Sequence, residues 1–231
     1  MAKLRLSLSS VLSVITAMLS VGVIAGGSHP AASQVNVPTN SKEFLSFPSS
    51  DSAVKLVAGW YYDKGTLYDN YCTYPGGDVS GYGRHCAIDY YKPGSNGNVT
   101  FPITATADGV AYRASSSDGK MTIEHAYADP SGRKFCTRYS HMDMRRPVIP
   151  VGQRVAVKRG QLVGWAGKTR TQKIHLHLVV RVGGCGGRPV DPYDLAAGLL
   201  DRNIAPVRAY YPGGSRFTGC GPDSLWLSCS R

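Results

Sequence analysis

The run Ile174-His-Leu-His-Leu-Val-Val180 decides the fold. It is apolar and rich in β-branched and long aliphatic residues, as is typical of a β-strand. In a strand, His175 and His177 project from the same face, while Leu176 and Leu178 point toward a core on the other. The run therefore predicts a strand with one buried face and one face that carries two imidazoles.

The remainder of the chain has a similar β character from about residue 53. Short runs of Val, Ile, Tyr and Thr alternate with Gly, Pro, Asn and Asp, and the chain holds 27 glycines. Many short strands with frequent turns predict an all-β fold, a compact antiparallel β-sandwich or barrel-like domain. A hairpin turn is expected at 128–133 and one short helix at 193–201. The expected strands are 54–57, 86–91, 103–107, 109–114, 120–127, 135–141, 154–157, 162–165 and 174–182.

The first residues have the pattern of a secretory signal peptide. Lys3 and Arg5 precede a nearly uncharged apolar stretch over 6–24, and small residues follow it. We expect cleavage after Ala25, with cleavage after Ala32 or an uncleaved membrane anchor as the alternatives. No later segment is apolar enough to span a bilayer. The protein is therefore expected to be secreted, extracellular or cell-wall associated, or periplasmic if the source has an outer membrane.

Composition divides the exported chain into three parts. Residues 26–50 are rich in Ser, Pro, Asn and Ala and predict a linker or pro-segment. Residues 51–200 form the expected domain, and 201–231 predict a C-terminal tail pinned by a disulfide. Six cysteines in an exported chain predict three disulfides, with Cys220 and Cys229 as a possible local pair. Zinc ligation by thiolates is the alternative, although no Cys-x-x-Cys pair is present.

The chain is basic, with 26 Lys and Arg against 15 Asp and Glu and a net charge of +11. A basic exported protein suggests an acidic partner reached by long-range attraction. Bacterial cell wall, an anionic membrane surface and nucleic acid all satisfy this condition, and solubility alone would also account for the charge. Charge does not choose among these partners.

Three histidine clusters suggest a metal site. His85 and Asp89 are four residues apart, which in an extended strand separates their Cα atoms by about 13 Å. That distance is too great for two ligands of one ion, so we expect a bend that leads from a loop at His85 into a strand at Asp89. His141 ends the expected strand 135–141, with Tyr139 on its strand face. Each cluster alone is also compatible with surface histidines or a turn-capping Asp, but together they provide what a mononuclear zinc hydrolase needs.

Taken in order, the motifs resemble those of the M23 family of zinc metallopeptidases, the lysostaphin-type and β-lytic-type peptidoglycan endopeptidases. The resemblance covers about residues 80–195, and it is the ordered set of motifs, not any single one, that makes it specific. The motifs are His85-x-x-x-Asp89, Ala105-Thr-Ala-Asp-Gly-Val110, Tyr139-Ser-His141, Val151-Gly-Gln-Arg-Val155, Gly160-Gln-Leu-Val-Gly164, His175-Leu-His177 and Pro189-Val-Asp-Pro192.

The resemblance implies a compact antiparallel β-domain (duplicated-hybrid-motif type) with a groove whose floor holds one Zn²⁺. It implies His85, Asp89 and His177 as zinc ligands, with a fourth position left for water. His141 and His175 would be the catalytic residues that activate the water, stabilise the tetrahedral intermediate and protonate the leaving amine. The substrate would be peptide stems or cross-bridges of peptidoglycan, and the partner an anionic cell wall and not nucleic acid. We expect a monomer.

Three residues depart from the family pattern. Ala87 replaces a usual Gly, Ile174 follows Lys173 where Gly-Pro usually precedes the second motif, and Val179 replaces a frequent acidic residue. These departures are the only support for the alternative of a non-catalytic relative that binds peptidoglycan or activates another hydrolase. Such relatives typically lose a ligand, and here all five site positions are filled, which counts against that alternative. A nucleic-acid-binding β-barrel is a third hypothesis, which explains neither the cysteines nor the histidines.

Three further side chains have an assigned role. Tyr82 could offer its hydroxyl to the oxyanion, or serve only in packing. His125 is expected to be structural, and Cys86 is expected to join a disulfide instead of the zinc site.

Overall fold

The computed structural model describes residues 43–58, 86–193, 195, 220 and 223–228. The expected signal peptide, His85 and Tyr82 lie outside these residues, as do most of the expected helix at 193–201 and most of the tail. Within the described part of the chain, no helix is both long enough and apolar enough to cross a membrane.

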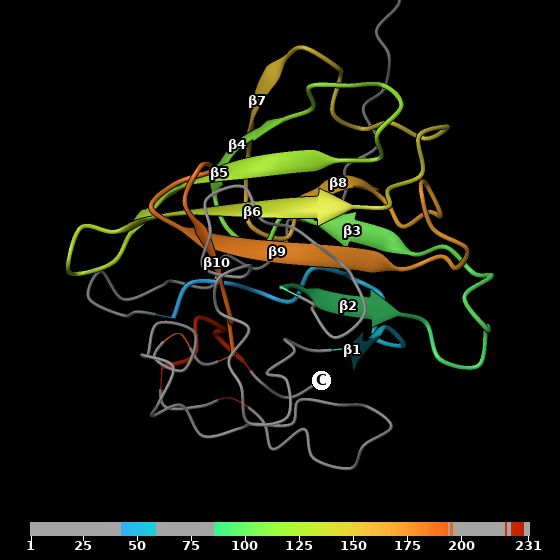
Figure 1. The fold of residues 1–231 in the computed structure, drawn as a ribbon, viewed down its shortest axis with the longest axis horizontal. Helices are drawn as coiled ribbons and strands as arrows, with labels where there is room; N and C mark the ends of the chain where they lie inside the picture. Colours follow the sequence, from blue (N-terminus) through green and yellow to red (C-terminus); the bar gives the residue numbers. More distant parts are fainter. Residues whose placement is uncertain (1–42, 59–85, 194, 196–219, 221–222, 229–231) are drawn as a thin grey trace, which may run out of the picture. The chain divides into compact units, whose positions relative to one another are not determined.

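The elements in the described residues are ten β-strands (Figure 1). All nine strands expected from the sequence are present, with ends that differ by a few residues, and β10 is an addition. The all-β fold is therefore confirmed. The strands are β1 Lys55–Ala58, β2 Ile88–Tyr91, β3 Pro102–Thr104, β4 Gly109–Tyr112, β5 Met121–Ala128, β6 Lys134–Ser140, β7 Arg154–Val157, β8 Leu162–Trp165, β9 Leu176–Val182 and β10 Arg188–Val190.

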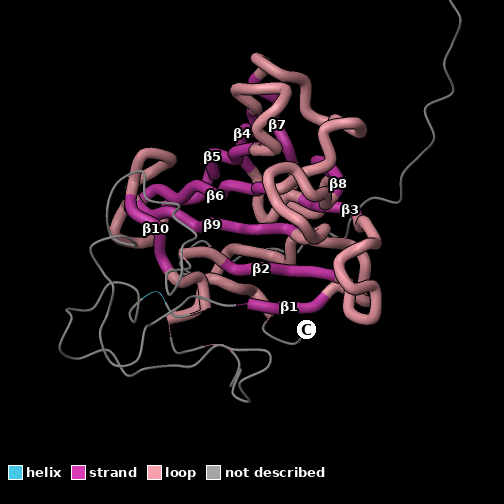
Figure 2. The backbone as a smooth tube through the Cα atoms, turned by 45° about the vertical axis from the view of Figure 1, so that its right-hand side comes forward, coloured by secondary structure: helices cyan, strands magenta, loops and turns pink. Residues whose placement is uncertain are grey.

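The strands form two antiparallel sheets. The larger has the order β1-β2-β9-β6-β5-β4-β7, with β10 added beside β9, and the smaller consists of β3 and β8. Figure 2 shows these strands from a second direction, with β2, β9 and β6 running side by side. Buried side chains of both sheets, among them Ile103 of β3 and Val163 of β8, join one hydrophobic core.

Strand β9 occupies the middle of the large sheet. One edge pairs with β6, while the other edge pairs with β2 over its first half and with β10 over its second half. Leu176 and Leu178 are fully buried in the core, as their alternation in the sequence predicts. The strand is buried along its whole length. It therefore provides a fixed position for the His177 side chain on its other face.

Strand β10 was not expected, and its composition explains why. It is three residues long, contains Pro189, and follows the glycine-rich turn between Val182 and Arg188. Proline removes a hydrogen-bond donor and is tolerated at a sheet edge, and β10 pairs only with β9.

A disulfide joins two parts of the chain that are distant in sequence. Cys136 of β6 is bonded to Cys185 in the turn between β9 and β10, and Cys86 and Cys220 are also disulfide-bonded. No described cysteine is free, so none of the four acts as a zinc thiolate. The expected pairing of Cys220 involves Cys229, which lies outside the described residues.

Two segments near the ends of the described chain complete the core. Phe44 and Leu45 are fully buried, and Leu45 forms a parallel bridge with Trp226. The backbone amides of Phe44 and Leu45 both donate to the carbonyl of Leu225. The sequence-based boundaries place Phe44 and Leu45 in the linker; they belong to the packed domain, because apolar side chains next to Ser and Pro pack as well as those within strands.

Candidate active site

The site begins with a cross-strand pair in the large sheet. Asp89 of β2 lies directly opposite His177 of β9, so both side chains project from the same face of the sheet. His177 Nδ1 is 3.0 Å from Asp89 Oδ1. Regular strand pairing therefore brings together two residues that are 88 positions apart in the sequence.

The path of the chain before Asp89 is the expected one. Residue 87 forms a bend and the strand starts at Ile88. Cys86, Ala87 and Ile88 are buried, which anchors the entrance to β2 on the core. The prediction of a bend that leads into a strand is confirmed, and the bend occurs at Ala87 without the glycine that is usual in the family.

His175 stands at the entrance to β9, on the same side as His177. Its backbone forms an antiparallel bridge with Gly167, and its Nε2 is 3.9 Å from Asp89 Oδ2. Its Nδ1 is 2.9 Å from the carbonyl oxygen of Lys173. A Cβ on Gly167 would lie 2.5 Å from the backbone nitrogen of Asp143, so glycine allows the segment beside His175 to approach the segment that follows His141.

His141 reaches the site through a break in strand geometry. It directly follows β6, where Ser140 is opposite His177 and Tyr139 is opposite Leu178. Strict alternation along the strand, which the sequence predicts, would put His141 on the same face as Tyr139, and Tyr139 is buried in the core. That placement is wrong, because the backbone of His141 has a φ of 62° and leaves the strand path. The ring centroid of His141 lies 4.5 Å from that of His175 and 5.6 Å from that of His177.

Backbone carbonyls define the tautomers of two histidines. His141 Nδ1 is 2.8 Å from the carbonyl oxygen of Thr169, and His175 Nδ1 is bonded to that of Lys173. A carbonyl only accepts hydrogen bonds, so in the neutral form of each ring Nδ1 carries the proton and Nε2 carries the lone pair. Two imidazoles with Nε2 as the basic nitrogen thus lie beside the Asp89–His177 pair.

The environment of His141 favours its neutral form. Burial, the largest effect, lowers the pKa of His141 to about 4, and the neighbouring imidazoles of His175 and His177 act in the same direction. The bond to Thr169 and the charge of Asp89 oppose this shift. The ring is therefore uncharged at neutral pH.

The donors present suit a catalytic zinc ion. Imidazole nitrogen and carboxylate oxygen are the ligands of hydrolytic zinc sites, and two donors 3.0 Å apart can both lie about 2 Å from one ion. Within the described residues no group of three His, Cys, Asp or Glu side chains is arranged to hold a metal. The third expected ligand, His85, lies outside them. The structure thus brings together four of the five expected site residues.

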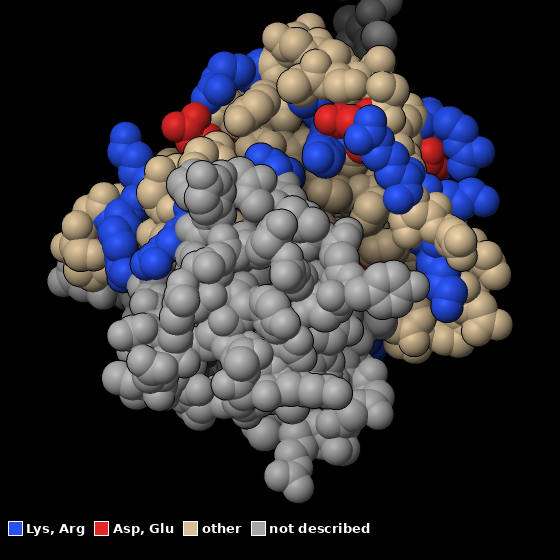
Figure 3. All heavy atoms as spheres, in the orientation of Figure 1, with Lys and Arg blue, Asp and Glu red and all other residues tan. Residues whose placement is uncertain are grey.

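Sequence reasoning missed the residues that bind His141 and His175. Thr169 and Lys173 act through their carbonyl oxygens, which every residue type has, so no sequence signal marks them. Both belong to the loop 167–173, whose cations Lys168, Arg170 and Lys173 are exposed. Figure 3 shows that Lys and Arg recur over the described surface on the face seen in Figure 1.

His125, which was expected to be structural, lies away from the site. Its side chain is buried, with Nε2 3.0 Å from the Thr137 hydroxyl and Nδ1 3.3 Å from the carbonyl of Asp108. Its ring packs against the edge of Phe44. These contacts place it in the core.

Comparisons with known proteins agree with the motifs. Residues 83–192 match the sequence model of peptidase family M23, whereas no curated protein matches the chain. Among solved structures, the catalytic domain of the antimicrobial peptidase lysostaphin from Staphylococcus simulans is 24% identical, with 60% of this chain and 88% of that chain covered and a TM-score of 0.39.

Two further structures are similar. A mutant of the catalytic domain of the prophage-encoded M23 protein EnpA from Enterococcus faecalis is 24% identical, with 63% of this chain and 93% of that chain covered and a TM-score of 0.42. Csd3 from Helicobacter pylori is 18% identical, with 65% of this chain and 32% of that chain covered and a TM-score of 0.40. The family match rests on residues 83–192, which span Asp89, His141, His175 and His177. Over this segment the chain is similar to peptidase family M23.

Proposed function

We propose that the protein is an exported zinc-dependent endopeptidase that hydrolyses peptide bonds in bacterial peptidoglycan. The observation that carries the proposal is the convergence of Asp89 and His177, 3.0 Å apart, with the rings of His141 and His175 beside them. The family match supports a peptidase. The choice of peptidoglycan follows the resemblance of the motifs to the lysostaphin-type enzymes.

Asp89, His177 and His85 would hold the zinc in this proposal. Bound zinc supplies Lewis-acid chemistry, which polarises the scissile carbonyl and makes water acidic near neutral pH. The protein contributes the position of the ligands: β2 and β9 hold the Asp89 and His177 side chains on one sheet face, with Oδ1 and Nδ1 3.0 Å apart.

His141 and His175 would move the protons. In each ring the proton on Nδ1 is held by a backbone carbonyl, so Nε2 is the nitrogen that accepts a proton from the attacking water. The same nitrogen, once protonated, donates to the leaving amine. Each imidazolium can also donate a hydrogen bond to the developing oxyanion.

The surface charge suits an anionic cell wall. No Asp or Glu lies between Asp143 and Asp191, whereas Lys168, Arg170 and Lys173 in that interval are exposed in the loop that contacts His141 and His175. A positive surface beside the site raises the local concentration of an acidic polymer.

The test is digestion of purified peptidoglycans by the exported form of the protein, with and without a zinc chelator. Fragments are identified by mass spectrometry. Chelator-sensitive fragments with new amino termini would support a zinc endopeptidase and identify the bond. Intact wall after treatment with zinc-loaded protein would contradict the proposal and favour a peptidoglycan-binding or hydrolase-activating protein instead.

A further inference from the structure

We propose that Thr169 is a positioning residue for His141, and that its side-chain hydroxyl, together with its carbonyl, fixes the tautomer of that ring. The inference rests on the proposed function for its effect on catalysis. The tautomer of His141 in the metal-free protein tests the role of Thr169 separately from catalysis.

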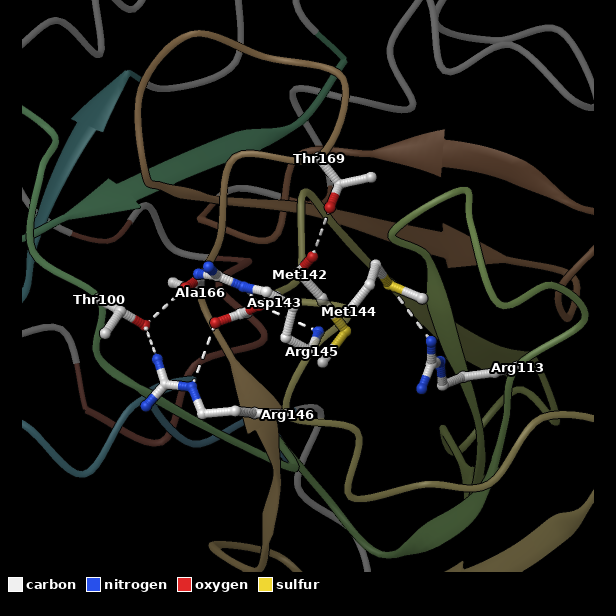
Figure 4. A network of polar contacts seen from close by, with 9 residues as sticks. All are labelled: Thr100, Arg113, Met142, Asp143, Met144, Arg145, Arg146, Ala166 and Thr169. Carbon is white, nitrogen blue, oxygen red and sulfur yellow. Dashed lines mark hydrogen bonds and ion pairs between the residues drawn. The ribbon is translucent and has the colours of Figure 1, made fainter.

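Thr169 contacts two consecutive residues with two different groups. Its hydroxyl donates to the carbonyl oxygen of Met142 over 2.8 Å, and its own carbonyl accepts from His141 Nδ1 over 2.8 Å. We call this pair of bonds the Thr169 clamp. Figure 4 shows the bond from the Thr169 hydroxyl to Met142. Because the two bonds join the same two stretches of chain, the hydroxyl determines the position of the Thr169 carbonyl relative to the His141 imidazole.

The clamp is supported from the turn between β4 and β5. Gly119 has a φ of 68°, and a Cβ there would lie 2.6 Å from Cβ of Thr169. The carbonyl of Gly119 accepts from the backbone nitrogen of Met142 over 3.0 Å. Three segments distant in sequence, around Gly119, Met142 and Thr169, thus meet directly behind His141.

The segment that follows His141 is fixed by an ionic network. Asp143 binds Arg146, with 3.1 Å between Oδ2 and Nε, and its amide donates to the carbonyl of Trp165. The Arg146 guanidinium lies 4.5 Å from the centre of the Trp165 ring and donates to the Thr100 hydroxyl. Figure 4 shows the bonds of Arg146 to Asp143 and Thr100, beside Met142 and Thr169. The backbone of His141 is thereby held in its left-handed conformation.

The loop itself offers little packing that could replace the hydroxyl. Lys168 and Arg170 are exposed, and Thr169 is half-buried between them. The ligands Asp89 and His177, by contrast, are held by the strands β2 and β9. Loss of the hydroxyl should therefore free the His141 ring without loosening the metal.

The experiment compares Thr169→Val, which keeps the shape and removes the hydroxyl, with Thr169→Ser, which keeps it. Thr171→Val, in the same loop, is the matched control. On peptidoglycan, Thr169→Val is expected to lower kcat about tenfold with KM and zinc content unchanged. Thr169→Ser and Thr171→Val are expected to stay within about twofold of the wild type.

The tautomer of His141 is read by ¹⁵N NMR of the metal-free and zinc-loaded protein. The wild type should show the proton on Nδ1, and Thr169→Val a mixture of both tautomers. Gly119→Ala, which displaces Thr169 from the opposite side, should give the same signature. Retention of kcat and of the pure Nδ1–H tautomer in Thr169→Val would overturn the proposal. If the wild type cleaves no peptidoglycan, the function fails, but the tautomer measurement still decides the role of Thr169.

Discussion

Individual side chains of the site are held in two different ways. Strand pairing fixes Asp89 and His177 directly opposite each other, whereas hydrogen bonds to loop carbonyls fix His141 and His175. This division predicts that metal binding and proton transfer can be separated by substitution.

His177→Ala should lose zinc and activity together, because it removes a proposed ligand from the buried strand β9. We expect activity to fall by more than about 100-fold. His141→Ala or His175→Ala should keep most of the zinc and lose about 100-fold or more in kcat, the usual contribution of acid–base groups. Metal content and peptidoglycan digestion are measured on the same samples. Full zinc occupancy in His177→Ala would show that the ligand assignment is wrong.

His125 makes the stability of the domain depend on pH. Burial lowers the pKa of His125 to about 4 from its ordinary value of 6.5, and Arg159 acts in the same direction while Asp108 opposes it. Between these two values the unfolded chain binds the proton and the folded protein does not, so stability is lost as the pH falls from about 6.5 toward about 4. From pH 7 to pH 5 this loss is about 2 kcal/mol.

Urea unfolding of the wild type and His125→Gln at these two pH values checks this prediction. The variant lacks the hydrogen bonds of the His125 ring at both pH values. The quantity compared is therefore the change in unfolding free energy between pH 7 and pH 5. The wild type should lose about 2 kcal/mol more than the variant. Equal losses would mean that His125 is already protonated in the folded protein at pH 5.

Among the elements, the strands were predictable and the connections were not. The alternation in 174–180 predicts both the strand and the face of Leu176 and Leu178, because period-two patterns report which side is buried. Alternation gave the wrong face for His141, since one backbone torsion at the end of β6 reverses the direction of its side chain. The role of Thr169 depends on its backbone carbonyl, and the formation of β10 depends on its pairing with β9. Neither feature produces a recognisable pattern of residue types in the sequence.

The disulfide between β6 and the β9–β10 turn should contribute strongly to stability. Cys136 and Cys185 are separated by 49 residues, and closing a loop of that length restricts the unfolded chain by about 4 kcal/mol in the chain-entropy description. The double variant Cys136→Ala/Cys185→Ala should lose about this amount of unfolding free energy in urea. A reduced wild-type sample is a poor control, because Cys86 and Cys220 are also bonded. A loss below about 1 kcal/mol would contradict the expectation.

For the whole molecule, charge should control its encounter with peptidoglycan, the substrate that we propose. Lys168 and Arg170 are exposed beside the site, so Lys168→Gln/Arg170→Asn should raise KM for peptidoglycan severalfold at low ionic strength. Asn is chosen for residue 170 because its φ is 62°. The difference from the wild type should shrink at about 1 M salt, where the screening length falls to about 3 Å. Turnover of a small uncharged peptide substrate serves as the control. A KM difference that is independent of salt would argue against charge attraction.

The joint between the two ends of the packed chain has a consequence for how the protein is made. Phe44 and Leu45 are hydrogen-bonded to Leu225, and Trp226 closes the same part of the core. Residue 44 is synthesised long before residue 226, and all ten strands lie between these two positions in the sequence. Phe44 and Leu45 therefore lack these partners until the residues of every strand have been made. Closure of this part of the core is thus among the last contacts that a growing chain can form within the described residues.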